Sequence, residues 1–115
     1  MGYSHYWKKV GMPPTEKKWA QIQERAREIV EKHKDILCFE FNQPDKKPEI
    51  SSRCVQFNGK GDDGCETFLL LRNMEDWEFC KTERELYDVA VVEMLKAVKE
   101  LCPKWLSLAS DGNVF

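Results

Sequence analysis

At 115 residues, of which 42% are hydrophobic and 11% aromatic, the chain can form one domain with its own core, over residues 1–115. Its 18 basic and 20 acidic residues are mixed along the sequence and leave a net charge of −2. That balance argues against a non-specific nucleic-acid binder but allows a small anionic ligand. No apolar run is long enough to span a membrane and no signal-peptide core follows the start, so we expect a cytoplasmic protein.

Five cysteines are present, an odd number, and no two of them form a Cys-x-x-Cys pair. We therefore expect a reducing compartment and thiols that are mostly buried and inert. A structural zinc site would require cysteines paired at short spacing. The five are Cys38, Cys54, Cys65, Cys80 and Cys102.

The first half of the chain predicts two strands with a helix between them. Residues 3–10 are rich in aromatic side chains and end at a Gly/Pro cluster, which is typical of a strand and its stop. From residue 15 to about residue 33, apolar residues recur at helical spacing, and charged residues occupy the other face. Residues 36–41 alternate as a second strand does, and residues 42–48 form a polar loop.

The second half predicts a hairpin, a short strand, a long helix and a last strand. The hairpin joins residues 53–58 to residues 66–72 through the glycine-rich turn 59–64, and residues 77–80 form the short strand. Thr82 and Glu85 have the spacing of a capping box, which predicts a helix from Glu83 to about Cys102, where Pro103 ends it. Residues 105–109 form the last strand. This order predicts an α+β fold, with an antiparallel or mixed sheet of about five to six strands and two long helices packed on one face.

The predicted helix start at Glu83 is the first candidate site. A helix start exposes backbone N–H groups and favours an anion such as phosphate. Lys81 and Arg84 flank this start and Thr82 adds a hydroxyl, so we expect the three to hold phosphate. The alternative is a capped helix with solvated charges. Tyr87 and Asp88 follow in the next turn, where Asp88 either favours the helix dipole or accepts a hydrogen bond from a ligand.

The aromatic first strand is the second candidate. His5 and Trp7 share one of its faces with Tyr3, and such side chains can stack on a nucleobase or donate a hydrogen bond to it. The alternative is a core strand with a hydrogen-bonded histidine. Asn58 and Glu66 lie at strand ends beside the glycine turn, where they would read polar edges of a ligand, such as a ribose diol.

Catalytic and metal-binding sets are less specific, and we assign no catalytic residue, metal or cofactor. One alternative is a nucleophilic set of Cys65, His5 and Asp111, whose members would meet only in space. Another is a metal site of His5, Glu66, Asp88 and Asp111. We place Asp111 with the ligand-binding residues.

Four blocks of the chain, in this order, resemble a group of small uncharacterised bacterial and phage proteins that begin Gly-Tyr-Thr/Ser-His-Tyr-Trp. The blocks are residues 2–7, residues 57–68, residues 79–88 and residues 110–112. This chain departs from the group at Cys65, where members carry His, and at Glu85-Leu86, where they carry Lys-Pro. The resemblance implies no established activity. By analogy with small phage proteins that sequester the nucleotide signals of bacterial immunity, it suggests a phage anti-defence protein.

The leading hypothesis from the sequence is a small-ligand-binding protein that sequesters a nucleotide-derived anionic signal, in the manner of a phage sponge. We expect a homo-oligomer, because a small sponge often needs a subunit interface to enclose its ligand. One alternative is a small nucleotide hydrolase or phosphodiesterase using His5, Glu66 and Asp111. The other is an inhibitor that binds a host protein through the open face of the sheet.

Overall fold

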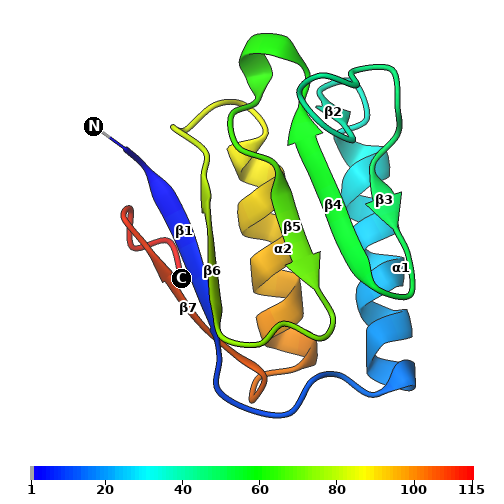
Figure 1. Ribbon diagram of the computed structural model, residues 1–115, viewed down its shortest axis with the longest axis vertical. Helices are drawn as coiled ribbons and strands as arrows, with labels where there is room; N and C mark the ends of the chain where they lie inside the picture. The colour runs from blue at the N-terminus through cyan, green and yellow to red at the C-terminus, as the bar shows by residue number, and fades with distance from the viewer. Residues whose placement is uncertain (1) are drawn as a thin grey trace.

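The computed structural model describes residues 2–115 and has an α+β fold with two helices and seven strands (Figure 1). The helices are α1 (Glu16–Lys32) and α2 (Asp88–Leu101), and a single 3-10 turn is η1 (Gly61–Asp63). The strands are β1 (Ser4–Lys9), β2 (Leu37–Cys38), β3 (Glu49–Ile50), β4 (Cys54–Gly59), β5 (Phe68–Leu71), β6 (Trp77–Lys81) and β7 (Leu106–Ser110). Within residues 2–115, no helix is long and apolar enough to cross a membrane.

The strands form two antiparallel sheets, so the expected single sheet of five to six strands is wrong. One sheet has the order β6-β1-β7, and in the other β4 pairs with β2, β3 and β5. The expected hairpin is confirmed, since Cys54 pairs with Leu71 and Phe57 with Phe68 across β4 and β5. The sheets meet where the start of β5 approaches the end of β6, and there Glu66 N–H donates to Lys81 O at 3.1 Å.

Helix α1 follows its sequence signals closely. The Thr15 side chain accepts from Lys18 N–H at 3.2 Å and caps the helix, which supports a start at Glu16. The buried residues Trp19, Ile22, Ala26 and Ile29 recur at helical spacing on one face. In the view of Figure 1, α1 lies behind β4 and α2 behind β5. The helices are joined across their exposed side by ion pairs such as Lys32 with Glu93, at 2.8 Å.

Strand β1 has one buried face and one partly exposed face, as its alternation predicts. His5 and Trp7 are 0% and 1% exposed, whereas Tyr6 between them lies on the opposite, more accessible face. The Trp7 ring packs on Phe68, with ring centroids 5.3 Å apart, and therefore belongs to the core that the two sheets share with the helices.

The predicted start of the second helix is wrong by five residues. Helix α2 begins at Asp88, and Glu83 and Arg84 have φ values of 53° and 59°, which a right-handed helix does not contain. The residues before the helix are fixed from elsewhere in the chain, because Tyr3 O accepts from both Thr82 N–H and Glu83 N–H. Residues 82–87 are therefore a tight turn that ends β6.

Candidate functional site

The four blocks that carry the family resemblance meet at one end of the two sheets. Residues 2–7 contact the turn after β6, because Tyr3 O accepts a hydrogen bond from Thr82 N–H at 3.0 Å. The closing block reaches β1 through Ser4 N–H, which donates to Asp111 Oδ2 at 2.9 Å. The block before β5 reaches β6 through Lys81 N–H, which donates to Glu66 Oε1 at 2.8 Å. Segments up to 107 residues apart thus form one cluster.

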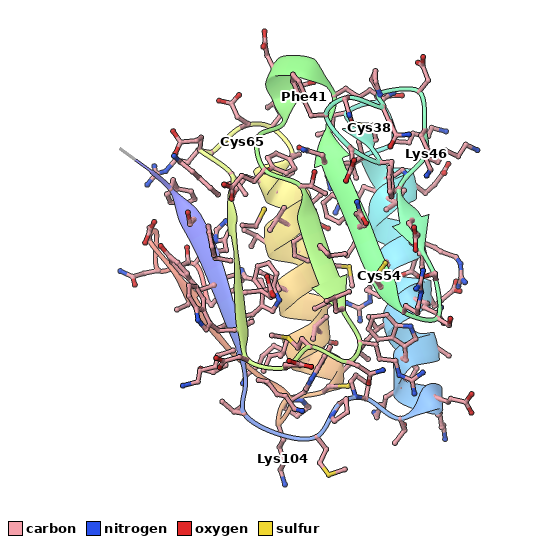
Figure 2. The ribbon with its side chains drawn as sticks, in the orientation of Figure 1. Cys38, Phe41, Lys46, Cys54, Cys65 and Lys104 are labelled. Atoms are coloured by element: carbon pink, nitrogen blue, oxygen red, sulfur yellow. The ribbon has the colours of Figure 1, made fainter. Side chains whose placement is uncertain are left out.

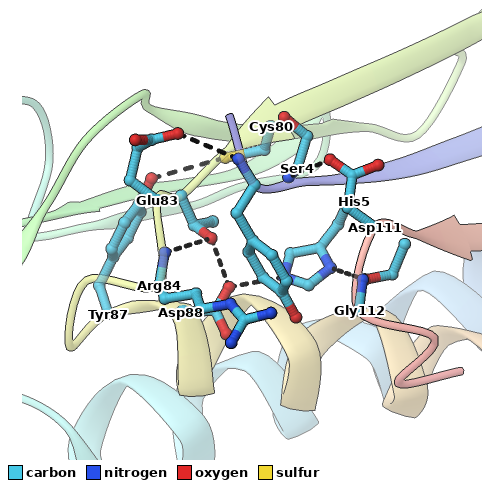
Figure 3. Close-up of polar contacts among 12 residues, drawn as sticks. Ser4, His5, Cys80, Glu83, Arg84, Tyr87, Asp88, Asp111 and Gly112 are labelled. Atoms are coloured by element: carbon cyan, nitrogen blue, oxygen red, sulfur yellow. Dashed lines mark hydrogen bonds and ion pairs between the residues drawn. The ribbon is translucent and has the colours of Figure 1, made fainter. Parts of the chain in front are cut away.

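A buried chain of hydrogen bonds runs through this cluster (Figure 3). Asp88 Oδ1 is 2.5 Å from Thr82 Oγ1 and 2.6 Å from His5 Nε2, and His5 Nδ1 is 3.0 Å from Ser110 Oγ. His5 and Thr82 are both 0% exposed. A carboxylate only accepts, so Thr82 Oγ1–H and His5 Nε2–H both donate to Asp88. On the other side of the ring, His5 Nδ1 and Ser110 Oγ form the next hydrogen bond of the chain.

Two aromatic rings pack against His5, and one of them contacts the exposed guanidinium of Arg84. The ring centroids of Tyr3 and Phe115 lie 5.3 and 5.5 Å from that of His5, both in edge-to-face arrangements. The Arg84 guanidinium lies 4.3 Å from the centroid of the Tyr3 ring, in a cation–π contact. Arg84 therefore marks the point where the buried network reaches the surface.

The turn that presents Arg84 has unusual backbone geometry. Glu83 and Arg84 are consecutive non-glycine residues in the left-handed region, which costs energy, and the bond from Glu85 N–H to Thr82 O closes them into a β-turn. Glu83 Oε1 accepts from Tyr3 N–H at 3.0 Å and lies 3.9 Å from Lys81 Nζ. These contacts fix the turn against β1 and leave the Lys81 ammonium only loosely paired.

Tyr87 and Cys80 lie beneath the turn and face inward. Tyr87 Oη–H donates to Glu66 O at 2.6 Å, and burial raises the pKa of this phenol far above its usual value. Burial also raises the pKa of the Cys80 thiol to about 12. Both groups are therefore neutral at physiological pH and act as parts of the core.

Five residues expected in a ligand site are buried instead: His5, Thr82 and Tyr87, described above, and Trp7 and Asn58. Trp7 is 1% exposed in the core, so its ring has no open face for a base. Asn58 is also 1% exposed, and its amide shapes the 59–64 turn, with Nδ2 donating to Cys65 O and Oδ1 accepting from Gly59 N–H. Packing explains the position of Trp7, and hydrogen bonding explains that of Asn58. Neither residue belongs to the site proposed below.

Acidic side chains gather on one side of the turn that follows β6. Glu66, Glu83, Glu85 and Asp62 line one cavity, of about 570 Å³, in which no lysine or arginine takes part. Such a cavity repels an anion. The Arg84 guanidinium, which lies over the Tyr3 ring, does not line this cavity.

The nucleophilic and metal sets considered from sequence are not assembled. Both ring nitrogens of His5 are occupied by Asp88 and Ser110, neither of which is Cys65 or Asp111. Residues 2–115 contain no group of three or more His, Cys, Asp or Glu side chains arranged to hold a metal ion. The structure instead places a hydroxyl, an imidazole and a carboxylate in one hydrogen-bonded row, formed by Ser110, His5 and Asp88.

Sequence reasoning did not single out Ser110, although its block was one of the four. Its only signal is its place before the Asp111-Gly112 turn, and nothing in that pattern points to a histidine 105 residues away. Comparison with known proteins adds no further guidance, since no protein-family model, curated protein or solved structure matches the chain. The binding site proposed below therefore rests on the geometry of this cluster.

Proposed function

We propose that the protein binds a small anionic, nucleotide-like ligand at the surface formed by Tyr3, Lys81 and Arg84, and holds it without turnover. The observation that carries this proposal is the strained turn that places the Arg84 guanidinium 4.3 Å from the Tyr3 ring centroid. Among residues 2–115, no carboxylate lies within 4.0 Å of that guanidinium, so its charge has no internal partner.

The arrangement suits a phosphate for a physical reason. A guanidinium that stacks on an aromatic ring uses its face and keeps its edge N–H groups for hydrogen bonds, and that edge matches two phosphate oxygens. The Lys81 ammonium, loosely paired at 3.9 Å from Glu83, supplies a second positive charge on the same turn. The Thr82 hydroxyl is committed to Asp88, so the contribution of Thr82 is to hold the turn.

The nucleotide-like body of the ligand follows from the neighbouring rings. Tyr3 is half-buried and Phe115 is 39% exposed, so each offers surface on which a base can stack. Sequestration fits better than turnover, because the His5 ring is 0% exposed and packs against Tyr3 and Phe115, out of reach of a ligand at the surface. The surface is open to solvent, and in this proposal a second subunit encloses the ligand in the host cytoplasm. The role of immune-signal sponge rests on the family resemblance.

Calorimetric titration with cyclic and linear nucleotides tests the proposal. Replacing Arg84 by alanine removes a charged hydrogen-bond donor, a loss of about 1.5–3 kcal/mol, which weakens binding roughly 10- to 100-fold. Arg53→Ala is the matched control, since Arg53 is exposed at the start of β4 and away from the turn. No binding of any nucleotide would refute the function, and equal losses in the two variants would refute the site.

A hydrolase is the second candidate, and the Ser110–His5–Asp88 arrangement favours it. In this alternative the Ser110 hydroxyl attacks the phosphorus of a phosphodiester and its proton passes to His5 Nδ1, which protonates the leaving alcohol as its P–O bond breaks. A water then attacks the phosphorylated Ser110, its proton passes to His5 Nδ1 and on to Ser110 Oγ, and the phosphate monoester is released. Chromatography of a nucleotide incubated with the protein separates the alternatives. Product that forms with the native protein and not with Ser110→Ala supports the hydrolase, whereas unchanged nucleotide supports sequestration.

A further inference from the structure

A second concave site lies outside the cluster described above. It is a cavity of about 390 Å³ bordered by the C-terminal end of α1, the loop before β3 and the residue after β4. Its charged lining consists of Lys34, Lys46, Lys47, Lys60, Glu31 and Asp45. Figure 2 shows Lys46 on the α1 side of the molecule, well separated in that view from Cys65, and no lining residue belongs to the turn 82–88. We call it the lysine cavity.

The charges of the lysine cavity are unbalanced. Four lysines against two acids give the lining a formal charge of +2, opposite in sign to the −2 of the whole chain. Lys34 is paired with Glu31 at 3.1 Å, and the Lys46 ammonium rests on the Phe39 ring at 3.8 Å from its centroid. Among the residues that the structure describes, Lys46, Lys47 and Lys60 have no carboxylate within 4.0 Å.

Lys46, Lys47 and Lys60 all line this concavity, so their positive charges repel one another, and an anion bound there reduces that repulsion. The anion is expected toward Lys46, Lys47 and Lys60 and away from the α1 end, because the last carbonyls of a helix carry partial negative charge. Apolar side chains, including Leu37 and Pro48, complete the lining. The lining therefore combines positive charge with apolar side chains.

We infer that the lysine cavity binds a phosphorylated small organic molecule, with its phosphate on the three unpaired lysines and its body on the apolar lining. The volume of about 390 Å³ lies in the range of small-molecule sites. This inference does not depend on the Tyr3–Arg84 site, because the two share no residue. Phosphate-bearing ligands are selected over uncharged ones here by charge, and over bare phosphate by the apolar surface.

Calorimetric titration with AMP, adenosine and inorganic phosphate at low ionic strength is the test. Removing one ammonium about 4 Å from a phosphate charge in water costs about a factor of five, so the double variant Lys47→Gln/Lys60→Gln should weaken AMP binding about 25-fold. The matched control is Lys17→Gln/Lys104→Gln, which removes two exposed lysines outside the cavity. The control should bind AMP as the native protein does, and both variants should keep the native circular dichroism.

The inference is overturned if AMP does not bind, if adenosine binds as tightly as AMP, or if the two double variants lose affinity equally. Arg84→Ala separates this result from the proposed function. If AMP binding is lost in Arg84→Ala but kept in Lys47→Gln/Lys60→Gln, the lysine cavity is refuted while the Tyr3–Arg84 site stands. If the reverse is found, the cavity stands alone.

Discussion

Replacing Asp88 by alanine should destabilise the protein more than any other single change to a partly exposed carboxylate. The Asp88 side chain is 20% exposed, yet it is the acceptor for His5 Nε2–H and Thr82 Oγ1–H, both on residues with 0% exposure. A buried donor left without a partner costs about 1–3 kcal/mol, so the two together cost about 2–6 kcal/mol. That range is a large part of the total stability of a domain, which is about 5–15 kcal/mol.

Urea unfolding followed by tryptophan fluorescence measures this loss as a lower midpoint at an unchanged slope. Asp88→Asn keeps an oxygen acceptor and should lose only about 1–2 kcal/mol. Glu16→Ala is the matched control, because Glu16 is also an acid in a first helical turn but is exposed, and it should lose about 0.3–1 kcal/mol. An Asp88→Ala protein as stable as the Glu16→Ala protein would refute the account of the buried network.

Three further predictions concern other parts of the molecule. Burial raises the pKa of Cys80 to about 12, so iodoacetamide at pH 8 should leave this thiol unmodified in the native protein and label it in urea. Peptide mass spectrometry measures the labelling, and rapid labelling of the native protein would contradict the burial of Cys80. Burial opposes ionisation of Glu93, but hydrogen bonds from Lys32 and His33 lower its pKa below the usual 4.5, so Glu93→Gln should lose about 1 kcal/mol at pH 7 in urea unfolding. That difference should shrink as the pH falls through the lowered pKa, since the stabilisation exists only while Glu93 is ionised; a difference that grows in acid would contradict it. A Cβ at Gly112 would lie 2.2 Å from the hydroxyl of Tyr3, so Gly112→Ala should lower the free energy of unfolding by about 1–3 kcal/mol, and an unchanged urea midpoint would show that the ring moves aside freely.

The parts of the fold that local signals determine could be predicted from the sequence. Helix α1 has a capping side chain at Thr15 and a single apolar stripe, and these two signals agree. The β4–β5 hairpin has alternating strands on both sides of a glycine-rich turn, and the structure has that pairing. In each case the partners lie within one element or one turn of each other.

The start of α2 could not be predicted, because a distant strand decides it. Thr82 and Glu85 have capping-box spacing, but Tyr3 O binds the backbone N–H groups of Thr82 and Glu83 and holds the turn outside helical geometry. The Thr82 hydroxyl that would cap a helix donates to Asp88 instead. Here contacts between residues about 80 positions apart in the chain override the local preference for a helix.

Some members of the cluster could be named from the sequence, but Ser110 and Phe115 were not among them, and the arrangement could not be predicted. His5, Thr82 and Asp88 were each expected near a ligand, yet periodicity gives no reason for them to bind one another. Trp7 and Asn58 illustrate the converse, since an aromatic ring and an amide suited to a ligand are equally suited to a core and a turn. For Trp7 the long-range pairing of β1 with β6 and β7 separates these two uses, whereas Asn58 is held by hydrogen bonds to nearby residues such as Cys65.

The most direct test of the central claim is a two-dimensional ¹H–¹⁵N spectrum of the protein titrated with the nucleotide that binds most tightly in calorimetry. Binding at the Tyr3–Arg84 surface predicts that the largest amide shifts occur at Tyr3 and across residues 81–88, with those shifts lost in the Arg84→Ala protein. Shifts confined to the lysine cavity, or to the exposed face of β1 and β6, would contradict the proposed site. A spectrum that no nucleotide changes would contradict the proposed function.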